Sequence, residues 1–213
     1  MTPAGYHDVH LPPDPARDVV WPVIADYVAR WVPANARILE IGAGYCGWIN
    51  ALSGVRRVAV DAWPEVARHA APGVETVVLD LSNGLAQFAN ESFDLVLASN
   101  VIEHFEPDAA AGIITEVTRL LRRGGRLIVV QPNFRYAYRH YFDDYTHRST
   151  FTHVSLANLL RSKGLTMVRV EPRFLPYSMR DSRLPVKPWL VRAYLRSPIR
   201  PLAGQMLLVA EKA

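Results

Sequence analysis

Short runs of apolar residues recur along the first two thirds of this chain, each followed by polar or glycine-rich residues. The runs that predict buried strands are Ile38–Ile41, Arg57–Asp61, Thr76–Asp80, Phe93–Asn100 and Arg126–Val130. Because they are apolar at nearly every position rather than at alternate ones, we expect both faces of a largely parallel sheet to be covered. Apolar residues at helical spacing predict helices around 18–31 and 108–121. This pattern predicts an α/β fold with a doubly wound sheet.

Three further elements are predicted after residue 130: a helix at Ser155–Lys163 and strands at Thr166–Val170 and Met206–Ala210. A chain of 213 residues with 50% hydrophobic content can bury one full core, so we expect a single domain over residues 1–213. We divide it into three zones: an N-terminal loop and helix (1–33), a cofactor-binding half (34–130) and an acceptor-side half (131–213). A long segment, 173–204, separates the last two strands and is interpreted as a lid-like insertion.

The most informative stretch is Ile38–Trp48, ILEIGAGYCGW, where a strand enters a glycine-rich turn. Gly42, Gly44 and Gly47 allow a sharp turn and a close approach of main-chain N–H groups to a ligand. Their spacing also satisfies the G-x-G-x-x-G pattern of dinucleotide-binding folds. Glu40 separates the two interpretations, because a carboxylate at the strand tip would repel a pyrophosphate but can pair with the amino group of an amino-acid-like ligand. We therefore interpret the turn as a site for S-adenosylmethionine.

Polar residues follow the next strands where the rest of such a ligand would lie. Asp61 comes about 20 residues after the turn, where α/β nucleotide folds place a carboxylate on the ribose hydroxyls. Asp80 and Leu81 can meet the adenine ring with a carboxylate and an apolar wall. The predicted cofactor-binding residues are Glu40, Gly42, Ala43, Gly44, Asp61, Ala62, Asp80, Leu81, Asn100 and Val101.

The sequence resembles class I S-adenosylmethionine-dependent methyltransferases from about residue 38 to residue 130. The likeness is carried, in order, by LEIGAG, VAVDA, LDLS, FDLVLASNVIEHF and LLRRGGRLIVV. It implies a mostly parallel, seven-stranded Rossmann-like sheet whose last strand is antiparallel. The chain departs from the family's usual E-x-G-x-G-x-G at Cys46, which stands where the third glycine is expected. We interpret this single cysteine as a small packing residue rather than a nucleophile.

A narrower resemblance extends almost to the C-terminus, through QPNFRYAYRHYFDDYTHRSTFT, RFLPYSMRDSRLP and GQMLLVAEKA. These segments are similar to a methyltransferase type 11-like bacterial group often associated with sugar and glycosyl-transfer gene clusters. The resemblance implies methyl transfer to a small-molecule or sugar-containing, glycan-type acceptor, which we interpret as O-methylation.

Candidate catalytic residues follow the fourth and fifth strands. Methyl transfer from a sulfonium needs an aligned nucleophile, and a hydroxyl nucleophile also needs a base. Glu103-His104 follows the fourth strand, and a segment with Asp143, Asp144 and His147 follows the fifth. We predict that His147, His104 and Asp143 carry the chemistry.

A metal-dependent mechanism is the alternative for the same region. Some RNA and quinone O-methyltransferases carry E-x-x-E-H after the fourth strand and bind Mg²⁺ with it. This chain has Asn100 at the first position, and a hard divalent cation prefers several charged oxygen ligands. We therefore expect no metal.

Charge and aromatic residues gather near the C-terminus. The net charge is +4 and the pI is about 9.4, a mild excess that says little about nucleic acid, and we expect none as a partner. Residues 173–200 combine arginines with Trp189 and Tyr194, which favours a lid over the active site. Alternatively, Lys187–Arg196 forms a short interfacial helix on anionic lipid.

Two other functions compete with methyl transfer. The G-x-G-x-x-G spacing also suits a dinucleotide-binding oxidoreductase or redox sensor, and a cofactor-binding protein without transfer activity would keep the same turn. The sequence has no apolar run of 18 residues and no signal pattern within its first 30 residues, so we expect a cytoplasmic protein. Its oligomeric state is not predicted.

Overall fold

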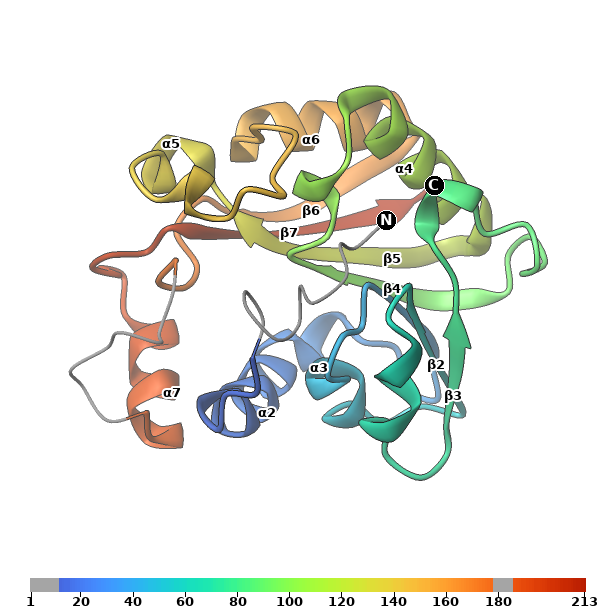
Figure 1. Cartoon of the computed structure of the whole chain (residues 1–213), viewed down its shortest axis with the longest axis horizontal. Coiled ribbons are helices and arrows are strands. Elements are labelled where there is room, and N and C mark those ends of the chain that lie inside the picture. Colours follow the sequence, from blue (N-terminus) through green and yellow to red (C-terminus); the bar gives the residue numbers. More distant parts are fainter. Residues whose placement is uncertain (1–11, 178–185) are drawn as a thin grey trace.

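Seven strands hydrogen-bond into one sheet in the order β3-β2-β1-β4-β5-β7-β6 (Figure 1). The computed structural model describes residues 12–177 and 186–213. The strands are β1 (Arg37–Ile41), β2 (Arg56–Asp61), β3 (Val74–Val78), β4 (Phe93–Ser99), β5 (Leu121–Pro132), β6 (Leu165–Glu171) and β7 (Gln205–Lys212). Strand β7 pairs antiparallel with both β5 and β6, whereas the other neighbours pair in parallel. The predicted fold class is therefore confirmed.

Helices cover both faces of the sheet (Figure 1). The α-helices are α2 (Ala16–Val28), α3 (Gly47–Asn50), α4 (Pro107–Leu120), α5 (Phe134–Ala137), α6 (His153–Ser162) and α7 (Pro188–Arg196). Short 3-10 helices are η1 (Ala29–Trp31), η2 (Pro64–Arg68), η3 (Leu81–Asn83), η4 (Ile102–His104) and η5 (Tyr141–Asp143). Helices α4 and α6 share one apolar core with the sheet, and α2, α3 and α7 share the other.

The two cores explain why the strands are apolar throughout. In β1, Leu39 and Ile41 point to the core of α4 and α6, while Ile38 points to the core of α2 and α3. The two edge strands are exceptions, because Val78 of β3 is 55% exposed and Val168 of β6 is 43% exposed.

The predicted third strand was placed two residues too far along the chain. Strand β3 ends at Val78, and the Asp80 carboxylate instead accepts a hydrogen bond from the Ser82 amide and caps η3. The other predicted strands overlap observed ones, and β5 is longer than predicted at both ends.

Parts of the earlier predictions fall outside the described residues. Residues 1–11 of the predicted N-terminal loop are among them, as are residues 178–185 of the predicted lid-like insertion. None of the helices in the described ranges combines the length and apolar character that a membrane span requires.

Candidate active site

The glycine-rich turn between β1 and α3 has backbone conformations that normally require glycine. Gly42 and Gly44 have φ of +65° and +48°, and Cys46 has φ of +56°. Cys46 therefore adopts a left-handed conformation that favours glycine. Its side chain is completely buried, and burial raises the pKa of the thiol to about 12, with further contributions from Glu40 and Asp61. A neutral, buried thiol fits the predicted packing role.

The turn after β4 packs directly on this loop. A Cβ atom added to Gly42 would lie 2.2 Å from Val101 Cγ2, so only glycine allows the approach. Asn100 precedes Val101 with φ of +52°, and its amide donates to the Val130 carbonyl oxygen. Two regions predicted to bind the cofactor are thereby in contact.

Asp61 fastens the loop from the neighbouring strand. Its Oδ2 accepts a hydrogen bond from the Gly44 amide at 2.7 Å, and its Oδ1 accepts one from the Trp63 amide at 2.8 Å. Each carboxylate oxygen can accept more than one hydrogen bond, so the predicted ribose contact is compatible with both of these.

Glu40 lies beneath the loop and is buried. Its Oε2 accepts a hydrogen bond from the Ile49 amide at 3.0 Å. Burial raises the pKa of Glu40 to about 8, and the nearby Asp61 adds to this effect. A cationic amino group of a ligand would act in the opposite direction, because it favours the ionised carboxylate.

The remaining predicted cofactor residues lie at the same sheet edge. Ala62 follows β2, and Asp80 and Leu81 follow β3, while Ala43 donates its amide to the Val60 carbonyl oxygen. Since parallel strands end at one edge, the whole predicted set gathers at the carboxyl ends of β1 to β4.

A second cluster joins η4 to the segment after β5. Glu103, His104 and His147 each place one potential ligand atom within 4.8 Å of the others, and the two imidazole rings are 4.9 Å apart. The Glu103 carbonyl oxygen accepts hydrogen bonds from the amides of Arg148 and Ser149, which ties the two segments together. The structure thus brings together two of the three predicted catalytic residues.

Glu103 is fully buried in this cluster. Among the described residues, neither of its carboxylate oxygens has a well-aligned hydrogen-bond partner, although the backbone of Glu103 and Val101 partly offsets the effect of burial on its pKa. Burial raises the pKa of Glu103 to about 8, and Asp144 adds to the increase. One carboxylate and two imidazoles are side chains that can bind a divalent cation. The expectation that the protein uses no metal therefore stays a prediction.

Hydrogen-bond partners define the tautomer of His147 and also surround the ring of His104. His147 Nδ1 lies 2.6 Å from the Tyr141 carbonyl oxygen, which can only accept, so Nδ1 carries the proton. His104 Nδ1 lies 2.8 Å from Thr146 Oγ1, and that hydroxyl donates to Asp144 Oδ1. The lone pair of His147 is therefore on Nε2, whereas the His104 ring has the Asn100 carbonyl oxygen as a further acceptor beside it.

Both imidazoles are neutral near pH 7. Burial lowers the pKa of His104 to about 4, aided by the neighbouring His147, although Asp144 and the Asn100 carbonyl act in the opposite direction. Burial also lowers the pKa of His147. A neutral imidazole has the protonation state that a general base requires.

The structure does not bring Asp143 to this cluster. Its side chain is 71% exposed and pairs with His140 at 3.1 Å. The adjacent Asp144 faces the cluster instead, where it accepts hydrogen bonds from both the amide and the hydroxyl of Thr146. Thr146 was not predicted, although the spacing Asp144-x-Thr146 is typical of a turn closed by an aspartate side chain.

Comparisons with known proteins agree with this geometry. Residues 39–129 match the family Methyltransf_11, described as a methyltransferase domain. Together with the sheet order and the glycine-rich turn, this match supports a class I S-adenosylmethionine-dependent methyltransferase domain. Its cofactor is S-adenosylmethionine.

One curated relative is a bifunctional methionine biosynthesis protein MetXA/MetW from Rhodopirellula baltica, 25% identical over 153 residues. The match covers 65% of this chain but only 23% of that protein. Among solved structures, the chain is similar to the 1,6-didemethyltoxoflavin-N1-methyltransferase of Burkholderia thailandensis, with 24% identity, a TM-score of 0.63, and coverage of 99% of this chain and 84% of that one.

A possible histamine N-methyltransferase from Thermotoga maritima is also similar, at 20% identity and a TM-score of 0.68, with 93% of this chain and 91% of that chain covered. At these identities the solved structures establish the shared fold.

Proposed function

We propose that this protein transfers a methyl group from S-adenosylmethionine to a hydroxyl oxygen of a small-molecule or glycan-type acceptor. The observation that carries the proposal is the pair of neutral imidazoles beside the turn after β4. An amine with a free lone pair can attack a sulfonium without a base, whereas a hydroxyl must lose its proton. The His104–His147 pair supplies groups suited to that proton transfer.

His104 is the better candidate for the base within this proposal. It is partly exposed, whereas His147 is buried. The Asn100 carbonyl raises the pKa of His104, so the ring lies close to the turn after β4. Val101 of the same turn packs against Gly42. When the His104 ring accepts the acceptor's proton, its positive charge is stabilised by Asp144 through Thr146.

The acceptor can be identified with methyl-labelled S-adenosylmethionine and fractionated cell extract. The labelled product is then analysed by mass spectrometry and NMR to find the methylated atom. Asp61→Ala serves as the control, because a variant with weakened cofactor binding should label the same fraction more slowly at a limiting cofactor concentration. A product methylated at nitrogen, formed at the same rate by His104→Gln, would contradict the proposed chemistry.

A further inference from the structure

Helix α7 has an exposed face that the active site does not explain. Val191 and Leu195, one turn apart, are buried in the core that α7 shares with α2. Trp189, Arg192 and Arg196 are spaced by three and four residues, so they lie along one exposed side of the helix, next to its buried stripe. The Trp189 side chain is 66% exposed. A large aromatic ring and two guanidinium groups therefore lie together on the outer side of this helix.

The loop that follows α7 adds two aliphatic side chains. Ile199 is 77% exposed and Leu202 is 88% exposed. Leu202 also has φ of +57°, a left-handed conformation that a leucine rarely adopts. A strained backbone that holds an aliphatic side chain in water suggests a use for that side chain.

The same stretch carries a local excess of positive charge. Its basic residues are Lys187, Arg192, Arg196 and Arg200, and residues 186–204 contain no acidic residue. Arg192 pairs with Asp26 at 3.0 Å, but both side chains are largely exposed and such a pair contributes little. Lys187 and Arg196 add two further exposed cations.

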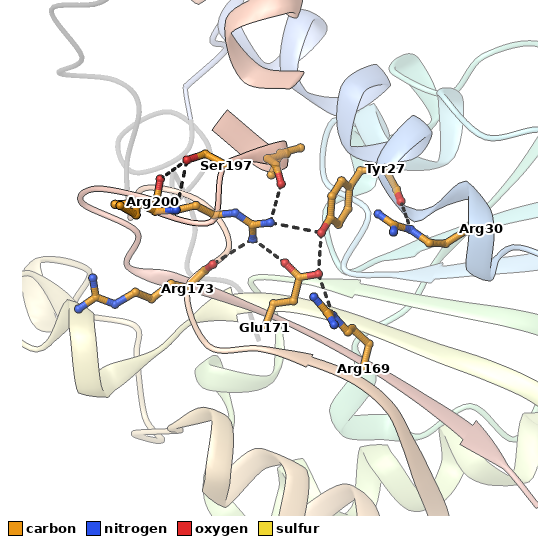
Figure 2. Close-up of polar contacts among 9 residues, drawn as sticks. Tyr27, Arg30, Arg169, Glu171, Arg173, Ser197 and Arg200 are labelled. Atoms are coloured by element: carbon orange, nitrogen blue, oxygen red, sulfur yellow. Dashed lines mark hydrogen bonds and ion pairs between the residues drawn. The ribbon is translucent and has the colours of Figure 1, made fainter. Parts of the chain in front are cut away.

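A buried polar network fixes this surface to the rest of the molecule (Figure 2). Arg200 donates to the Glu171 carboxylate, to the Tyr27 hydroxyl and to the Leu195 carbonyl oxygen. The same guanidinium reaches the Arg173 carbonyl oxygen at 3.0 Å. Arg200 thereby connects the loop and the end of α7 to α2 and to β6. The exposed residues are presented on a fixed support rather than on a mobile flap.

We propose that this surface, defined by Lys187, Trp189, Arg192, Arg196, Ile199 and Leu202, docks on an anionic lipid bilayer. Trp189 suits the headgroup region, where an amphipathic ring is stabilised. Ile199 and Leu202 would insert their aliphatic groups, and the cations would meet lipid phosphates. This inference does not depend on the methylated atom or on the acceptor.

Vesicle flotation tests the docking. The protein should bind vesicles that contain phosphatidylglycerol but not vesicles of phosphatidylcholine alone, and the binding should weaken with salt because exposed charges are screened within about 10 Å at 0.1 M. Arg192→Gln/Arg196→Gln should reduce partitioning about fivefold for each charge removed, which corresponds to about 1 kcal/mol per basic residue. Trp189→Ser/Ile199→Ser/Leu202→Gly should abolish binding at any salt concentration.

Matched variants elsewhere on the surface control for general effects. Val55→Ser/Val78→Ser removes exposed apolar groups near the other edge of the sheet, and Arg139→Gln/Arg161→Gln removes the same number of exposed cations. Both controls should partition like the wild type, and all variants should keep cofactor affinity. No binding to anionic vesicles, or equal losses in the control variants, would overturn the proposal. Self-association lost only in the triple variant would assign the surface to a second copy and overturn it as well.

Discussion

Cys46 shows how one residue can satisfy two requirements at a cofactor loop. Its backbone takes the left-handed conformation of the expected glycine, and its small thiol packs without exposure. A bulkier side chain would combine the strain of positive φ with steric overlap in a closed core. The sequence indicated the substitution, and the structure shows that the cysteine adopts positive φ within the tight turn.

Asp61 is expected to contribute to cofactor binding in two ways, through the ribose and through the Gly44 amide that it already holds. Asp61→Ala should weaken S-adenosylhomocysteine binding by roughly 1–3 kcal/mol, because hydrogen bonds to a buried carboxylate are lost. Isothermal titration calorimetry measures this directly. NAD⁺ is the control ligand and should not bind. Tight binding of NAD⁺ without a response to S-adenosylhomocysteine would contradict the cofactor assignment.

His104 is expected to act as the base, with the Asp144–Thr146 pair as its positioning partners. With the true acceptor, His104→Ala should lower kcat by about 10²–10⁴-fold and leave the affinity for S-adenosylhomocysteine unchanged. Because the pKa of His104 is lowered to about 4, activity should decline only as the pH falls toward that value.

Thr146 offers a matched comparison for this assignment. Thr146→Val removes the hydroxyl that orients His104, whereas Thr146→Ser keeps it. Only the valine variant should lose activity and change the tautomer signals of His104 in ¹⁵N NMR. If kcat were unchanged in His104→Ala but reduced in His147→Ala, the base would be His147.

At the scale of elements, the apolar runs were enough to predict the strands. A strand that is covered on both faces of the sheet is apolar at consecutive positions, and this pattern can be recognised in the sequence. The cofactor residues followed from the rule that parallel strands end at one edge. The choice between Asp143 and Asp144 could not be made in this way, since consecutive residues at the end of a short helix point in different directions. Contacts between distant segments, such as Arg200 with Tyr27, also leave no local pattern.

The Arg200–Glu171 pair should stabilise the attachment of α7 and its loop. Glu171 is buried and also accepts hydrogen bonds from the Tyr27 hydroxyl at 2.6 Å and from Arg169 at 3.1 Å. Arg200→Met should lower the free energy of unfolding by about 3 kcal/mol, because a buried carboxylate loses its main cationic partner.

Urea denaturation measures this loss. The double variant Arg200→Met/Glu171→Gln should recover part of it, since no unpaired charge remains buried. The surface pair Arg56–Glu75 is the comparison, and Arg56→Met should cost less than about 1 kcal/mol. Equal losses in the two single variants would show that burial of the Arg200 pair has no special effect.

At the scale of the whole molecule, the two buried acids Glu40 and Glu103 link stability to pH. Each has a pKa near 8 in the folded protein, raised by burial above the ordinary value of 4.5. Between these values the folded state holds more protons than the unfolded state. The free energy of unfolding should therefore fall as pH rises through this window, by up to about 1.4 kcal/mol per pH unit for each acid.

Glu103→Gln isolates one of the two contributions. The amide has the same shape and cannot ionise, so the variant should lose less stability than the wild type between pH 5 and pH 8, whatever its stability at pH 5. Denaturant titrations across this window give the slope. A surface control, Glu65→Gln, should keep the wild-type slope because Glu65 is exposed. A Glu103→Gln slope identical to that of the wild type would show that the carboxyl is already ionised in the folded protein and that its charge is compensated.

The contribution of Glu40 can be tested with S-adenosylhomocysteine, whose amino group favours the ionised carboxylate. Adding this ligand to the Glu103→Gln variant should reduce the remaining dependence of the free energy of unfolding on pH.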